Sequence, residues 1–160
     1  MDSRRKTNCL SYFKTLSGLN FEIATDASLV YEIKLVKSIE KKEESSLSKF
    51  VFKELCEYLK GARKTFTFKH KIEATGFTKN VLDFVQTIPY GETKTYRDVA
   101  EAIGKPRSYR AVGNALNKNP LLIVVPCHRV TSKTGLGGYK YGSEIKRTLL
   151  ELEGKYKDSF

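Results

Sequence analysis

The residues best suited to nucleophilic chemistry are Cys127 and its neighbour His128, which follow a short apolar run. A free thiol has a pKa of about 8.5, so a nucleophilic cysteine needs a base or a positive neighbour. Adjacent side chains diverge on an extended chain, and a proton passing between these two would therefore need a bridging water. Glu153 could orient the imidazole, although spacing alone leaves this third assignment open.

The other two cysteines, Cys9 and Cys56, are far apart in the chain, and no Cys-x-x-Cys pair exists. A closed zinc site uses four Cys or His ligands at short paired spacings, and this chain has two histidines in all. We therefore expect three free thiols, no metal and no cofactor. Structural burial is the alternative explanation for any one of the thiols, and it suits Cys56, which lies among apolar residues.

The chain carries a formal charge of +11 over 160 residues. Between Thr93 and Arg147 there are eleven Lys and Arg against three Asp and Glu. Such local basic density favours a polyanion, with nucleic acid as the first candidate, whereas solubility is the simpler explanation. No apolar run approaches the ~20 residues of a membrane span, and no secretory signal is visible. We expect an intracellular protein with no membrane partner.

Two short helices are expected upstream of Cys127, around residues 96–103 and 108–116. Thr95 can cap the first, with Asp98 as its capping-box partner, and Ser108 can cap the second. A glycine turn between two such helices is typical of a helix-turn-helix motif, although a plain helical hairpin inside a core fits as well. Polar side chains lie off the apolar stripe of the second helix: Arg110, Asn114 and Asn117.

The pattern of apolar residues over the first seventy positions predicts a small α/β unit. Alternating apolar residues over 19–36 favour a hairpin, helical spacing favours a helix over 47–59, and alternation over 65–72 favours a third strand. No chemistry is evident in this part of the chain.

The later part predicts mainly helices. One covers residues 77–88, the apolar run 121–125 is expected to be a buried extended segment that leads into Cys127, and a last helix starts near 143. The last helix is expected to bury Ile145, Leu149 and Leu152, with a neighbouring stripe of Lys146, Leu150 and Glu153.

Several ordered motifs resemble one family, the O6-alkylguanine-DNA alkyltransferases. The segment Pro126-Cys-His-Arg-Val130 is similar to their active-site signature. The resemblance extends from about Thr75 to Gly154 and also rests on Ile88-Pro-Tyr-Gly-Glu-Thr93 with Tyr96, Arg110-Ala-Val-Gly113, Asn119-Pro120, Gly138-Tyr139, and Lys146 through Leu149-Leu150 to Glu153-Gly154.

The resemblance implies a role for each matching residue. Cys127 would accept the alkyl group, His128 would take the thiol proton through water, Glu153 would orient His128, and Asn119 would brace the turn. Tyr96 would assist extrusion of the nucleotide, Arg110 would fill the vacated space in the duplex, and Tyr139 would wall the base pocket. Backbone groups at Cys127, Val130 and Lys140 would read the guanine edge. The full set expected to contact substrate or DNA is Tyr96, Ser108, Arg110, Ala111, Asn114, Arg129, Val130, Tyr139, Lys140 and Lys146.

The expected fold is α+β, with a small ribonuclease-H-like α/β domain over 1–73 and a mainly helical domain over 74–160. The second domain would contain the helix-turn-helix and resemble a winged helix. The implied activity is single-use transfer of the alkyl group from O6-alkylguanine in duplex DNA, with O4-alkylthymine as a further substrate, by a monomer in the cytoplasm, or in the nucleus of a eukaryote. Base flipping is required, because the O6 atom is engaged in pairing.

Three other functions remain open from the sequence. An alkyltransferase-like protein binds the lesion without transferring the alkyl group, but it lacks the acceptor cysteine that this chain has. A helix-turn-helix regulator would explain the charge but not the Cys127-His128 pair. A thiol hydrolase would use that pair but would not need the basic helices.

Overall fold

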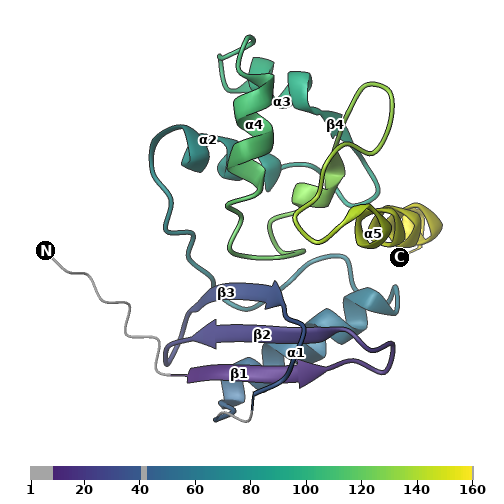
Figure 1. The fold of residues 1–160 in the computed structure, drawn as a ribbon. Coiled ribbons are helices and arrows are strands. Elements are labelled where there is room, and N and C mark those ends of the chain that lie inside the picture. Colours follow the sequence, from purple (N-terminus) through teal and green to yellow (C-terminus); the bar gives the residue numbers. More distant parts are fainter. Residues whose placement is uncertain (1–8, 41–42, 160) are drawn as a thin grey trace, which may run out of the picture. The chain divides into compact units, whose positions relative to one another are not determined.

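The computed structural model describes residues 9–40 and 43–159 (Figure 1). The chain divides into two compact units between Ile72 and Glu73. The expected mixture of α and β structure is confirmed, with α-helices in both units and small sheets in each. Among the described residues, no helix has the length and apolar character needed to cross a bilayer.

The first unit is built on an antiparallel sheet of β1 (Cys9–Lys14), β2 (Asn20–Thr25) and β3 (Val30–Leu35), in that order. The expected hairpin is confirmed as β2 and β3. Strand β1 was not expected, because its one buried side chain is Ser11, whose hydroxyl donates to Ser48 Oγ at 2.7 Å. A strand whose inward position is polar gives no apolar alternation to detect.

Helix α1 (Ser46–Leu59) packs against this sheet (Figure 1) and confirms the helix expected over 47–59. The expected strand over 65–72 is wrong: only His70 pairs with a strand, in an isolated bridge to Val30. The backbone N–H and the hydroxyl of Thr67 donate instead to the Glu54 carboxylate of α1, at 2.9 and 2.5 Å. The Thr67 N–H is therefore not available for a strand ladder, and pairing of this segment is limited to the bridge around His70, where Lys71 N donates to Val30 O.

The second unit holds α2 (Gly76–Val85), α3 (Tyr96–Ala102), α4 (Tyr109–Leu116) and α5 (Ser143–Tyr156), together with a short parallel pair of β4 (Lys94–Thr95) and β5 (Val130–Thr131). Helix α4 packs on both α2 and α3 (Figure 1). The capping box of Thr95 and Asp98 is present at the start of α3. Ser108 stands at the N-cap of α4, but its side chain makes no cap hydrogen bond, contrary to expectation.

The buried face of α5 differs from the one expected. Its buried residues are Lys146, Leu149 and Glu153, whereas Ile145 and Leu152 are only half-buried. Positions 146, 149 and 153 fit helical spacing as well as the expected apolar positions 145, 149 and 152 do. The helix therefore turns two ionisable side chains into the unit, and each of them needs an internal partner.

Candidate active site

Cys127 opens a short 3-10 turn, η1 (Cys127–Arg129), directly after the apolar run. The run 121–125 is buried as expected but is not extended. It folds back on itself, with Val125 N donating to Leu121 O at 3.0 Å and Ile123 at a φ of 71°. This tight reversal sets Cys127 next to Asn119 rather than at the end of a strand.

Asn119 links the two ends of this reversal. Its Nδ2 donates to Val125 O at 2.8 Å and lies 3.2 Å from Cys127 Sγ, while its Oδ1 accepts from Leu121 N at 2.9 Å. Asn119 is itself buried. The side chain thus fixes both the turn and the sulfur, which is the bracing role that the resemblance implies for it.

His128 and Glu153 meet inside the unit although 25 positions separate them in the chain. His128 Nε2 lies 2.8 Å from Glu153 Oε1, and both side chains are fully buried. Burial acts to raise the pKa of Glu153, but hydrogen bonds from His128 and Arg129 outweigh it and hold this pKa far below the usual range. Because the carboxylate is charged, Nε2 carries the proton and donates it, which leaves Nδ1 as the basic nitrogen of a neutral ring.

The Cys127 thiol is 7% exposed. Burial raises its pKa, while the hydrogen bond from Asn119 and the charge of Lys146 pull in the other direction without reversing the shift. Cys127 is therefore a thiol at neutral pH. Its sulfur becomes a strong nucleophile only when a base removes the proton.

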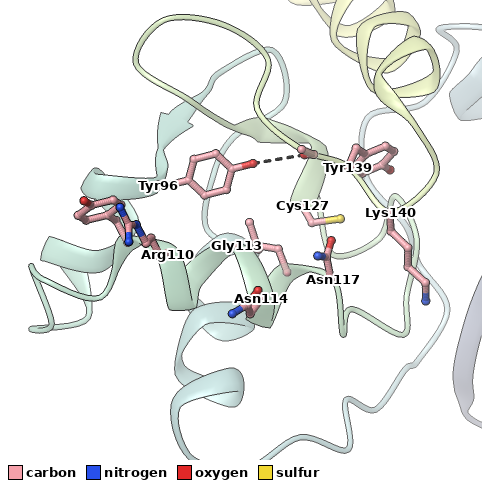
Figure 2. A pocket seen from close by; sticks show the side chains of 11 residues that line it. Tyr96, Arg110, Gly113, Asn114, Asn117, Cys127, Tyr139 and Lys140 are labelled. Atoms are coloured by element: carbon pink, nitrogen blue, oxygen red, sulfur yellow. Dashed lines mark hydrogen bonds between the residues drawn. The ribbon is translucent and has the colours of Figure 1, made fainter.

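A pocket of about 360 Å³ opens in front of Cys127. This volume lies within the range of small-molecule sites. Figure 2 shows Tyr96 and Tyr139 on either side of Cys127, with Arg110 beyond Tyr96 in this view. Of the residues expected to contact substrate or DNA, the lining includes Tyr96, Arg110, Asn114, Tyr139 and Lys140.

Helix α4 also supplies four lining residues that the sequence analysis does not assign to substrate or DNA contact, although it notes Asn117 as a polar residue of this helix: Tyr109, Gly113, Leu116 and Asn117. Together with Arg110 and Asn114, they form a stripe spaced three and four residues apart. Because residues three and four positions apart lie on the same face of a helix, the sequence alone could have predicted this second face. Five expected contact residues do not line the pocket: Ser108, Ala111, Arg129, Val130 and Lys146.

Arg129 was expected to contact substrate or DNA, and the structure places it elsewhere. Its Nε donates to Glu153 Oε2 at 2.9 Å, its Nη2 to Glu153 Oε1 at 2.7 Å and its Nη1 to Ile88 O at 2.6 Å. All three nitrogens are thus used inside the protein, and the side chain is buried. The expected contact with DNA would require this bidentate pair to break.

Lys146 is also internal. Its ammonium group donates to Val130 O at 2.6 Å and to Gly138 O at 3.0 Å, and the residue is fully buried. Burial lowers its pKa to about 8. Lys146 therefore links the turn after Cys127 to the glycine-rich loop 135–138, whose last residue lines the pocket. The charge of Lys146 also lies close enough to favour the thiolate of Cys127.

Gly137 in this loop meets two requirements that only glycine fulfils. Its φ is +73°, and a Cβ atom there would lie 2.6 Å from Tyr96 Oη. We expect Gly137→Ala to cost roughly 1–2 kcal/mol of stability from backbone strain and, by displacing Tyr96, to slow the reaction of the Cys127 thiol with a molecule bound in the pocket. Thermal unfolding and the rate at which a small thiol reagent labels Cys127 measure the two effects.

Gly135→Ala is the matched control, because a Cβ at Gly135 would make only an ordinary contact at 3.8 Å with Ser132. Equal losses in both variants would show that the loop, and not the approach of Gly137 to Tyr96, is what matters.

Within the described part of the chain, no group of three or more His, Cys, Asp or Glu side chains is arranged to hold a metal ion. The three cysteines are free thiols. The chemical possibilities of the site therefore centre on one buried thiol, one neutral imidazole and an open pocket.

Comparison with known proteins shows what the chain is similar to. A model of the DNA-binding domain of 6-O-methylguanine DNA methyltransferase matches residues 76–155. A methylated-DNA–protein-cysteine methyltransferase of Methanosarcina barkeri is 50% identical over 97 residues, which cover 60% of this chain and 61% of that protein. The protein of the same name from Saccharolobus islandicus is 41% identical over 71% of this chain and 73% of its own length.

Solved structures extend the similarity to nearly the whole chain. The O6-methylguanine methyltransferase of Mycobacterium tuberculosis is 30% identical, covers 94% of this chain and 95% of its own, and has a TM-score of 0.83. The same organism's OGT in complex with DNA has a TM-score of 0.81 at 31% identity, over 92% of this chain and 93% of its own. By sequence, the chain matches less than two thirds of several curated relatives, including 61% and 56% of the Methanosarcina barkeri and Bacillus subtilis proteins.

Proposed function

Since the chain belongs to the 6-O-methylguanine DNA methyltransferase family, we propose that it repairs alkylated DNA by moving the alkyl group from guanine O6 onto Cys127. It would act as a methylated-DNA–protein-cysteine S-methyltransferase on duplex DNA, with O4-alkylthymine as a further substrate. The thioether product has no leaving group that would return the alkyl group, so each chain acts once.

The position of Cys127 Sγ carries this proposal. The sulfur borders a pocket of base-binding size (Figure 2) and is held by Asn119. His128 follows Cys127 on the same turn and pairs with Glu153 of α5. Neutral His128 takes the thiol proton at Nδ1 through a water molecule. Glu153 then stabilises the imidazolium that forms.

The displacement balances without a cofactor. A bond forms between Cys127 Sγ and the alkyl carbon as the bond from that carbon to O6 breaks, and the electron pair leaves with the guanine. The thiol proton passes through water to His128 and finally neutralises the guanine. Backbone groups at Cys127 and Lys140, which line the pocket, read the edge of the base, and Tyr139 forms the wall beside the sulfur. Val130, the third residue implied by the resemblance, lies outside this lining and would have to come into reach when the base is bound.

Duplex DNA must present the base outside its stack, at a cost of about a few kcal/mol. We assign α3 and α4 to a helix-turn-helix of winged-helix type, whose second helix enters the minor groove. Nine Lys and Arg between Thr93 and Arg147 are exposed and can neutralise phosphates. Tyr96 assists extrusion, and Arg110 occupies the space that the base leaves.

The remaining assignments follow from the same proposal. The unit before Ile72 is taken as a ribonuclease-H-like domain, and the chain is expected to work as a monomer wherever the cell keeps its DNA.

Arg110→Ala separates the flipping role from the chemistry. We expect repair of duplex DNA to fall roughly 10- to 100-fold, because the gap in the stack is no longer filled. Reaction with free O6-benzylguanine should change little, since a free base needs no flipping. Arg147→Ala, which removes an exposed charge from α5, is the control for general electrostatic loss. Equal losses on both substrates would argue against the flipping role.

A duplex that carries isotope-labelled O6-methylguanine tests the proposed function itself. The label is expected to become covalently attached to the protein, on a peptide that contains Cys127. Tight binding with all label left on the DNA would instead favour the non-catalytic lesion-binding alternative. Release of label into solution with continued turnover would favour a hydrolase.

A further inference from the structure

The Glu153 carboxylate is shared among four donors. Oε1 accepts from His128 Nε2 and Arg129 Nη2, and Oε2 accepts from Arg129 Nε at 2.9 Å and from Gly91 N at 3.2 Å. Arg129 is the stronger partner, because its guanidinium is a cation that binds both oxygens in a fork. Arg129 alone thus balances the negative charge of Glu153, without a proton on His128.

The charges around His128 are unequal in number. From α5 it faces Glu153 and Lys146, and from its own turn it faces Arg129 and the neutral Cys127 thiol. His128 is therefore surrounded by one negative group, Glu153, and two positive groups, Arg129 and Lys146. Burial lowers the pKa of His128, the bond to Glu153 opposes this shift, and the charges of Arg129 and Lys146 reinforce it. A proton on His128 would be a third positive charge at a buried position.

We propose that Arg129 is a positioning residue that keeps His128 neutral, and so able to accept the thiol proton, by taking up the charge of Glu153. The inference rests on the proposed function, in which His128 is the base. Without Arg129, the unbalanced carboxylate would draw a proton onto His128, and the resulting imidazolium could not receive another from Cys127.

The geometry supports a role beyond simple packing. A buried ion pair in itself gives little net stability relative to apolar residues of the same volume. Arg129 also anchors the segment before α3 through Ile88 O and lies over the Tyr90 ring, with 5.7 Å from Cζ to the ring centroid. Its guanidinium is thus fixed from two sides in the orientation that serves both oxygens of Glu153.

The first test compares the pH dependence of alkylation in three proteins: the unaltered chain, Arg129→Lys, which keeps the charge, and Arg129→Gln, which removes it. Free O6-benzylguanine serves as substrate, so that DNA binding does not enter. We expect Arg129→Gln to move the acid limb of the rate profile up by about one pH unit or more, which is a loss of about tenfold on that limb. Alkaline pH should restore most of the rate.

Arg129→Lys should keep the acid limb near its original position even if its maximum rate falls, because the charge beside Glu153 remains. Lys146 stays charged throughout the acid limb in all three proteins, since its own pKa is about 8. A rate that falls by the same factor at every pH in Arg129→Gln would show a merely structural role and overturn the proposal.

The second test does not depend on alkyl transfer. The chain has only two histidines, so imidazole nitrogen NMR of the unmodified protein, with His70→Gln for assignment, reads His128 directly. We expect His128 to remain neutral and protonated on Nε2 at pH values where an ordinary histidine is already protonated, because burial lowers its pKa. An imidazolium at neutral pH would overturn the proposal. If the same NMR signals show that Arg129→Gln raises the pKa of His128 but no alkyl group is transferred by the unaltered chain, the proposed function fails while Arg129 is still the residue that keeps His128 neutral.

Discussion

Replacing Cys127 by serine is expected to abolish alkyl transfer, with a loss of more than about 10³-fold, the scale typical of a lost nucleophile. Serine occupies the same position beside Asn119, but its hydroxyl is a far weaker acid than a thiol, and neutral His128 cannot ionise it in the ground state. The pocket and α4 are unchanged, so affinity for a duplex with O6-methylguanine should be retained. Transfer assays and binding titrations measure the two effects separately.

Cys56→Ser is the control for this prediction, because Cys56 is a half-buried thiol of α1 whose pKa is raised by burial. It is expected to leave both transfer and binding intact. Transfer in Cys127→Ser at a rate near that of the parent, or its loss in Cys56→Ser, would place the acceptor elsewhere in the chain.

Replacing Glu153 by glutamine is expected to destabilise the protein by about 3–5 kcal/mol, because it leaves Arg129 buried without its counter-charge. It should also disable the site, since His128 loses the carboxylate that stabilises its protonated form. Chemical denaturation measures the first effect, and the rate with O6-benzylguanine measures the second. Glu151→Gln on the exposed face of α5 is the matched control and should change stability by less than about 0.5 kcal/mol.

The loss of stability in Glu153→Gln is expected to depend on pH in one direction only. Hydrogen bonds from His128 and Arg129 outweigh the effect of burial and hold the pKa of Glu153 well below its unfolded value. The stabilisation by Glu153 is then fully present above the usual carboxyl range and disappears as pH falls through the lower folded-state value. The difference in free energy of unfolding between the unaltered protein and Glu153→Gln should therefore persist in mild acid. If this difference in stability has already disappeared near pH 6, Glu153 is not a charged, buried carboxylate in the folded protein.

Much of the fold that positions the site was predictable, because local signals agreed with the final structure. The capping box of Thr95 and Asp98 marks the start of α3, and helical apolar spacing marks α1 and α2. Glu153 was assigned from the sequence as a third partner without a geometric reason. The structure supplies one, since Glu153 and His128 are 2.8 Å apart.

The buried cations were not predictable. Sequence patterns treat Arg and Lys as surface residues, so Arg129 and Lys146 were taken for contacts to substrate or DNA, and both were counted in the basic surface. Their burial depends on acceptors brought together only by tertiary packing: Glu153 for Arg129, and the carbonyl groups of Val130 and Gly138 for Lys146. The same dependence made α5 present Lys146 and Glu153 inward in place of Ile145 and Leu152.

Counting the alkyl groups that each chain accepts tests the central claim most directly. The unaltered protein is incubated with an excess of duplex DNA bearing O6-methylguanine, and transfer is followed to its end. Transfer should stop at one methyl group per active chain, with every methyl group recovered on Cys127 as a thioether. Repair that continues beyond one lesion per chain, or a methyl group recovered on any other residue, would contradict the account.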